Sequence, residues 1–153
     1  MSHVEESTVT PRIVVGVDGS EDSSKALDWA VAEAIRSRAT LELATAWMFP
    51  MALGYVFART PEEVRREVQR IADESLSRVA EAAPDMDVTS IVRESEAGPA
   101  LVEVSIGADL LVVGSRGHGG IRELLLGSVG TYCSRHACCP VVIVRGSEGV
   151  IPS

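Results

Sequence analysis

Residues 110–130 read LLVVGSRGHGGIRELLLGSVG, and this stretch is the most informative about the fold. Four consecutive apolar residues at its start are typical of a strand that is buried on both faces of a parallel sheet. A glycine-rich segment follows directly, and Gly127-Ser128 then opens a predicted helix over about residues 128–136. A buried strand, a glycine-rich loop and a helix in this order indicate an α/β protein.

Short apolar strands and helices alternate through the rest of the chain as well. A strand at 13–17 ends at Asp18-Gly19-Ser20, where Ser20 can cap a helix and Glu21 and Asp22 suit the positive end of that helix. The apolar periodicity predicts the remaining elements: a strand at 41–47, a helix at about 61–82, a strand at 86–93, a helix from Gly98-Pro99 to Ile106, and a last strand at 141–144. Five strands alternating with four helices predict a three-layer α/β fold with a doubly wound parallel sheet.

Charge restricts the class of partner. The chain carries a net charge of −8, which argues against a nucleic acid, because affinity for a phosphate backbone depends on Lys and Arg. The window 114–136 is an exception, since it holds Arg116, Arg122 and Arg135 against Glu123 alone. A basic, glycine-rich region in an acidic chain favours a small anion as the ligand.

Length and composition fit a single domain. We expect this domain over residues 12–146, with a loose leader at 1–11 and a tail at 147–153. No apolar run approaches the roughly eighteen residues that span a bilayer, and the acidic start MSHVEESTVTPR does not have the pattern of a signal peptide. We therefore expect no membrane partner and a cytoplasmic location.

Several conspicuous side chains are interpreted as structural. Cys133, Cys138 and Cys139 have no paired spacing, so we expect buried, reduced thiols rather than a disulfide framework or a metal site. Trp29 and Trp47 fall on predicted core faces. No Ser or Cys lies beside an obvious base in the sequence, so no catalytic residue is predicted, and a metal site stays undetermined.

The glycine-rich stretch has the composition of a phosphate-binding loop. Glycines let backbone N–H groups approach an anion, and the free N–H groups at a helix start attract phosphate. In doubly wound sheets, ligands bind beyond the carboxyl ends of the strands, where the strand order reverses. That rule selects Asp18 and the glycine-rich stretch, although Asp18 could instead cap the following helix and Arg116 could be a solvated surface charge.

The spacing Gly114, two residues, Gly117, nine residues, Gly127-Ser128 differs from the two commonest phosphate-binding motifs. With this pattern, G-x2-G-x9-G-[ST], the sequence resembles the ATP-binding branch of the universal stress protein family. IVVGVDGSEDS, ADLLVVGSRGHGG and RHACCPVVIV extend the resemblance over nearly all of residues 12–145. It implies a flavodoxin-like sheet, similar to that of the adenine-nucleotide α-hydrolases, with strand order 3-2-1-4-5.

The resemblance also implies a ligand, ATP together with magnesium, lying across the ends of the first and fourth strands. Asp18 would contact the adenosine, Ala46 would offer backbone groups to the adenine, and the glycine-rich stretch would hold the phosphates. The positions implied to bind the nucleotide are Gly16, Val17, Asp18, Ala46, Val113, Gly114, Arg116, Gly117, Gly127, Ser128, Val129 and Gly130. Many family members carry Ser or Thr at the position of Gly130, so we expect weaker ATP binding here, by about the 1 kcal/mol of one hydrogen bond.

The implied function is that of a nucleotide-dependent regulatory protein of the stress response, with at most slow ATP hydrolysis. Because residues 141–144 would form an apolar sheet edge, we expect a homodimer that pairs through this strand. Three alternatives stay open: an adenylating enzyme or slow ATPase, to which VDGSEDS bears a partial likeness, a nucleotide-free scaffold, and a scaffold that binds a cyclic nucleotide.

Overall fold

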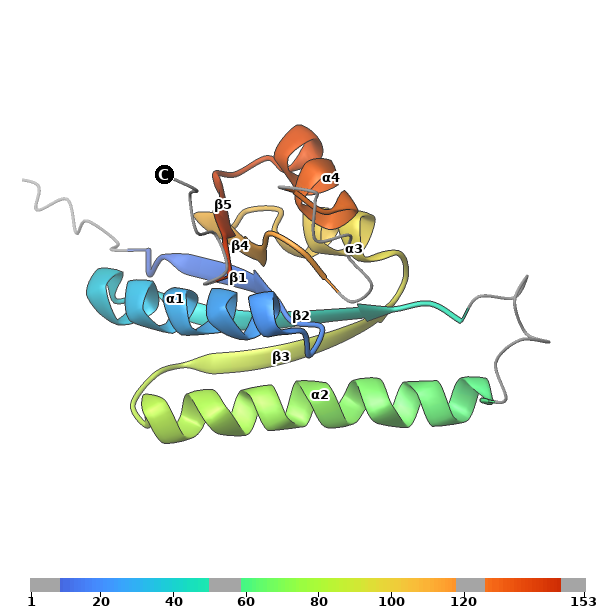
Figure 1. Cartoon of the computed structure of the whole chain (residues 1–153). Helices are drawn as coiled ribbons and strands as arrows, with labels where there is room; N and C mark the ends of the chain where they lie inside the picture. The colour runs from blue at the N-terminus through green and yellow to red at the C-terminus, as the bar shows by residue number, and fades with distance from the viewer. Residues whose placement is uncertain (1–8, 50–58, 118–125, 147–153) are drawn as a thin grey trace, which may run out of the picture.

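The computed structural model describes residues 9–49, 59–117 and 126–146. The elements in chain order are β1 (Arg12–Gly16), α1 (Glu21–Ser37), β2 (Thr40–Trp47), α2 (Pro61–Ala82), β3 (Val88–Glu94), α3 (Ala97–Val104), β4 (Leu110–Gly114), α4 (Ser128–His136) and β5 (Val141–Val144). All five strands pair in parallel in the order β3-β2-β1-β4-β5. Helices α1 and α2 cover one face of the sheet and α3 and α4 the other (Figure 1). The predicted fold class and strand order are confirmed.

Two predicted boundaries differ from the observed ones by two residues, and the other differences are of one residue. Strand β3 begins at Val88 rather than at residue 86, and α3 ends at Val104 rather than at Ile106. The Ser105 hydroxyl donates to the Val102 carbonyl, which the Ile106 N–H would use in a longer α-helix, and the Ile106 N–H donates to the Glu103 carbonyl instead. Gly107 then turns the chain at a φ of +79°. The proposed leader and tail fall almost entirely outside the described residues and stay predictions.

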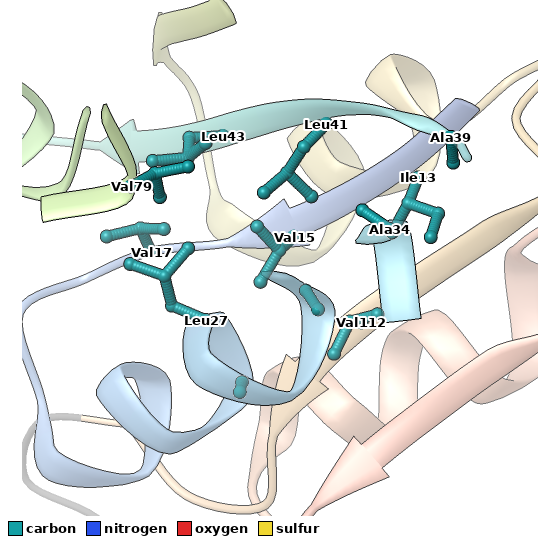
Figure 2. Close-up of a cluster of buried hydrophobic side chains, with 12 residues drawn as sticks. Ile13, Val15, Val17, Leu27, Ala34, Ala39, Leu41, Leu43, Val79 and Val112 are labelled. Carbon is teal, nitrogen blue, oxygen red and sulfur yellow. The ribbon is translucent and has the colours of Figure 1, made fainter. Parts of the chain in front are cut away.

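Alternating side chains of the central strands fill two separate cores. Ile13, Val15 and Val17 point towards α1, where they pack with Leu27 in the core that Figure 2 shows. Val14 points to the opposite face, into the core beneath α3 and α4. Because both faces of β1 are covered, its strand reads as an uninterrupted apolar run. Burying side chains of this size contributes roughly 1.5–3 kcal/mol each.

Four of the side chains expected to be buried are exposed or only half-buried. Trp29 is 38% exposed, because the buried face of α1 is formed by smaller residues such as Ala26, Leu27 and Ala30. Trp47 is half-buried at the end of β2. Of the cysteines, all free, Cys133 is buried, Cys139 is half-buried and Cys138 is exposed, since Cys138 lies in the turn between α4 and β5.

Candidate functional site

A pocket opens at the carboxyl ends of β1, β2 and β4, on the side of the sheet that α3 and α4 cover. The space between its lining residues measures about 460 Å³ and is partly open to solvent. The described residues that line it are Gly16, Val17, Asp18, Ser23, Ala44, Ala46, Ala97, Leu101, Val113, Gly114, Arg116, Gly117 and Val129. The strand order reverses between β1 and β4, so the pocket lies where the fold predicts a ligand.

One side of the pocket is apolar and built from small residues. Ala44 and Ala46 lie two residues apart on the same face of β2. Their short side chains leave room in front of Leu101 and Val129. Gly16 has the same effect on β1, because a Cβ there would lie 2.9 Å from Cδ1 of Leu101. An apolar slot with backbone groups at its edge suits a flat heterocyclic base.

The opposite side is polar and brings together the loops that follow β1 and β4. The Asp18 carboxylate accepts hydrogen bonds from the Ser20 N–H at 2.9 Å and from the Ser20 hydroxyl. The Asp18 N–H donates to Oγ of Ser23 at 3.0 Å. A Cβ on Gly117 would lie 2.8 Å from Oδ2 of Asp18, so only glycine lets the two loops approach this closely without a shift.

Asp18 does not cap α1 itself but holds the residue that does. Ser20 is the residue that caps α1, since its Oγ accepts from the Ser23 N–H at 3.2 Å. Asp18 accepts from Ser20 and thereby holds the cap in place, while the Asp18 residue itself lines the pocket.

Arg116 lines the pocket and pairs with a buried carboxylate. Its Nε lies 3.5 Å from Oδ2 of Asp22, which is 6% exposed and also accepts from the Ser115 hydroxyl at 2.8 Å. Ser115 and Arg116 directly follow β4, so Asp22 fastens the start of the glycine-rich stretch to the first turn of α1. From the sequence, Asp22 was expected only to suit the positive end of α1, because nothing in the local pattern shows a contact across more than ninety residues.

The glycines of the stretch are required by close packing. A Cβ on Gly114 would lie 2.8 Å from the backbone carbon of Asp22, and one on Gly130 would lie 2.6 Å from Cδ1 of Leu126. Among the described glycines, only Gly19 and Gly107 have a positive φ. The described part of the loop therefore does not use the backbone angles that glycine alone favours, and its glycines serve to bring chain segments together.

Nine of the twelve expected nucleotide contacts line the pocket. The other three, Gly127, Ser128 and Gly130, lie at the start of α4. Gly127 caps this helix, and within the described residues no side chain accepts from its first N–H groups. Ser128 and Val129 line an adjoining groove that also includes Ala46, so the helix start borders the apolar side of the pocket.

The structure adds lining residues that the sequence did not single out. They are Ser23, Ala44, Ala97 and Leu101. Ala44 could have been found from its spacing of two residues from Ala46 on one strand, but Ala97 and Leu101 come from α3, whose position over the pocket follows only from the fold. His118 and Arg122, two further polar residues of the stretch, lie outside the described residues.

Across residues 9–49, 59–117 and 126–146, no three His, Cys, Asp or Glu side chains come close enough to hold a metal ion. In the same ranges, no helix has the length and apolarity needed to cross a membrane.

Sequence relatives identify the family. A model of the universal stress protein family matches residues 10–145. Universal stress protein YxiE of Bacillus subtilis is 33% identical over 145 residues, which cover 88% of this chain and 98% of YxiE. Universal stress protein Rv2005c of Mycobacterium tuberculosis is 31% identical over 146 residues, which cover 92% of this chain and 50% of Rv2005c. The chain thus spans about half the length of this mycobacterial relative.

A solved structure agrees in both fold and sequence. It is described as a universal stress protein in complex with cAMP, is 32% identical, and superimposes with a TM-score of 0.68 over 88% of this chain and 96% of the other. The parallel sheet of order β3-β2-β1-β4-β5 and the match over residues 10–145 lead to one conclusion. This chain belongs to the universal stress protein family.

Proposed function

We propose that this protein binds an adenine nucleotide in the pocket at the ends of β1 and β4 and acts as a nucleotide-dependent regulator. The observation that carries the proposal is the composition of that pocket: an apolar slot between Ala46 and Leu101 faces a polar side formed by Asp18 and Arg116. The base would enter the slot, and the phosphate would lie against Gly117 and the start of α4, where helix N–H groups favour an anion.

Two ligands are candidates for this site. The glycine spacing favours ATP, whose magnesium would be coordinated mainly by phosphate oxygens, the ligands that this ion prefers. A cyclic nucleotide is the second candidate, because the 32% identical protein is described in complex with cAMP. Both would use the same base slot, since the two differ only beyond the nucleoside.

The regulatory role has further parts. We propose a cytoplasmic stress-response protein that works as a homodimer through β5 and changes its contacts when the nucleotide binds. We expect at most slow turnover. Ser23, the one hydroxyl among the described lining residues, accepts from the Asp18 N–H and donates to the Gly16 carbonyl, so it is not available to attack a phosphate. A nucleophile needs a neighbouring base, which this arrangement does not provide.

Equilibrium binding of labelled ATP and labelled cAMP to the full chain tests the proposal. We expect saturable binding of at least one of them, and a loss of at least about tenfold in Gly117→Asp, which places a second carboxylate against Asp18 and the incoming phosphate. Ala32→Asp is the matched control, because Ala32 is exposed on α1, lies outside the pocket lining and gains the same negative charge. Absence of saturable binding below millimolar concentration for both ligands would refute the proposal.

A further inference from the structure

A buried carboxylate, that of Asp22, lies behind the positively charged side chain of the pocket. Arg116 is the one cation among the described lining residues, and its Nε lies 3.5 Å from the Asp22 carboxylate. Asp22 is enclosed by its neighbours: Ser115 donates to Oδ2, and a Cβ on Gly146 would overlap Oδ1. The carboxylate is therefore fixed in place directly behind the guanidinium.

A buried charge of this kind acts on whatever anion enters the pocket. Water screens Asp22 poorly, because the residue is 6% exposed, so its field reaches the phosphate side of the site. An anion that approaches Arg116 also approaches Asp22, and the attraction to the first is reduced by the repulsion from the second. Both the attraction and the repulsion grow in proportion to the charge on the ligand, and Asp18, a carboxylate of the pocket lining, adds to the repulsion, so two carboxylates oppose one guanidinium.

We propose that Asp22 determines the specificity of the pocket by favouring adenine nucleotides with a single phosphate charge, such as a cyclic monophosphate, over nucleoside triphosphates. This inference rests on the proposed function and names the class of nucleotide that the site selects. Asp22 lies outside the pocket lining and acts through Arg116, so it is a positioning and charge-setting residue rather than a ligand contact.

Asp22→Asn isolates the charge from the packing. The amide keeps an oxygen that can accept from the Ser115 hydroxyl and has the same shape, but it removes the negative charge beside Arg116. Asp73→Asn is the matched control, because Asp73 is exposed on α2 and the substitution changes the net charge of the protein equally.

Calorimetric titration with adenosine, cAMP and ATP, in the absence of magnesium, gives the decisive series. In Asp22→Asn we expect adenosine affinity to stay within about twofold, cAMP affinity to rise by about threefold, and ATP affinity to rise by about tenfold or more, because each ligand charge adds to the gain. Asp73→Asn should leave all three affinities within about twofold. A gain that is equal for adenosine and ATP, or no gain for ATP, would overturn the inference.

A measurement on the unmodified protein provides a second test that needs no variant. The inference states that the Arg116 charge is compensated, and the protein has a net charge of −8. Raising the salt from about 25 to about 300 mM should therefore strengthen ATP binding relative to adenosine binding, because salt screens the repulsion between ATP and the protein. A phosphate site with an uncompensated positive charge would show the opposite trend, and that result would also reject the inference. Failure of all three ligands to bind would instead refute the proposed function.

Discussion

At the scale of single residues, the structure gives Gly130 a different role from the one that the family pattern suggested. The family pattern suggested a missing phosphate-facing hydroxyl, but Gly130 is buried in α4, and the neighbouring Thr131 hydroxyl donates to the Gly127 carbonyl at 2.9 Å. A Cβ at residue 130 would lie 2.6 Å from Cδ1 of Leu126. We therefore expect Gly130→Ser and Gly130→Ala to bind nucleotide with equal affinity, because the added side chain meets Leu126.

The free energy of unfolding of Gly130→Ala, measured in urea, tests the predicted overlap with Leu126. Alanine in place of glycine within a helix ordinarily stabilises by up to about 1 kcal/mol, but we expect the overlap with Leu126 to cancel that gain, since overpacking costs about 1–3 kcal/mol. Tighter nucleotide binding by Gly130→Ser than by Gly130→Ala would show that the hydroxyl matters after all.

Cys133 gives the stability of the protein a dependence on pH. Burial, and to a smaller extent the neighbouring Cys139, raises the pKa of the Cys133 thiol from 9.0 to about 11. Between these values the unfolded thiol releases its proton before the folded one does, so the free energy of unfolding falls as the pH rises. Urea unfolding of wild type and Cys133→Ala at pH values below and above 9.0 measures this effect. We expect the wild type to lose more stability than the variant over this interval, whereas parallel losses would contradict the assignment.

At the scale of the elements, the sequence predicted what local physics controls. Strands β1 and β4 read as apolar runs because both of their faces are buried, and the start of α1 was visible from its cap, Ser20. The end of α3 was wrong by two residues, because a serine side chain closed the helix before the glycine signal was reached. Trp29 was misplaced because the apolar periodicity of α1 is carried by alanines, which left its largest apolar residue at the surface.

The residues of the candidate site also differ in whether the local sequence predicts them. Asp18 and Gly117 were found from the sequence because ligands bind beyond strand ends in this class of fold, and the structure places the two in contact range. Asp22 was not found, because its importance comes from Ser115 and Arg116, which reach it only after β1 and β4 pair side by side. Local patterns thus identify residues that line the pocket, such as Asp18 and Gly117, while the position of the buried Asp22 charge depends on the complete fold.

At the scale of the whole molecule, β5 is an edge strand of the sheet, where the proposed homodimer would pair. The carbonyls of Pro140 and Val144 accept from Leu111 and Ser115, so these alternate positions face β4. The backbone groups of Val141 and Ile143 then point away from β4, because successive residues of a strand alternate. Among the described residues, no strand pairs with this outer side, and an apolar edge of this kind favours pairing with another chain.

The direction of these backbone groups makes the proposed homodimer testable with a pair of proline variants. Ile143→Pro removes an outward N–H and leaves the hydrogen bonds to β4 in place, so we expect a folded monomer where the wild type is a dimer at micromolar concentration by sedimentation equilibrium. Val142→Pro removes an inward N–H instead, and it should lower the unfolding midpoint more than Ile143→Pro does, because it breaks the pairing with β4. A monomeric wild type, or a folded Ile143→Pro variant that dimerises as tightly as the wild type, would exclude β5 as the interface, because this variant lacks one of the outward N–H donors that edge pairing would use.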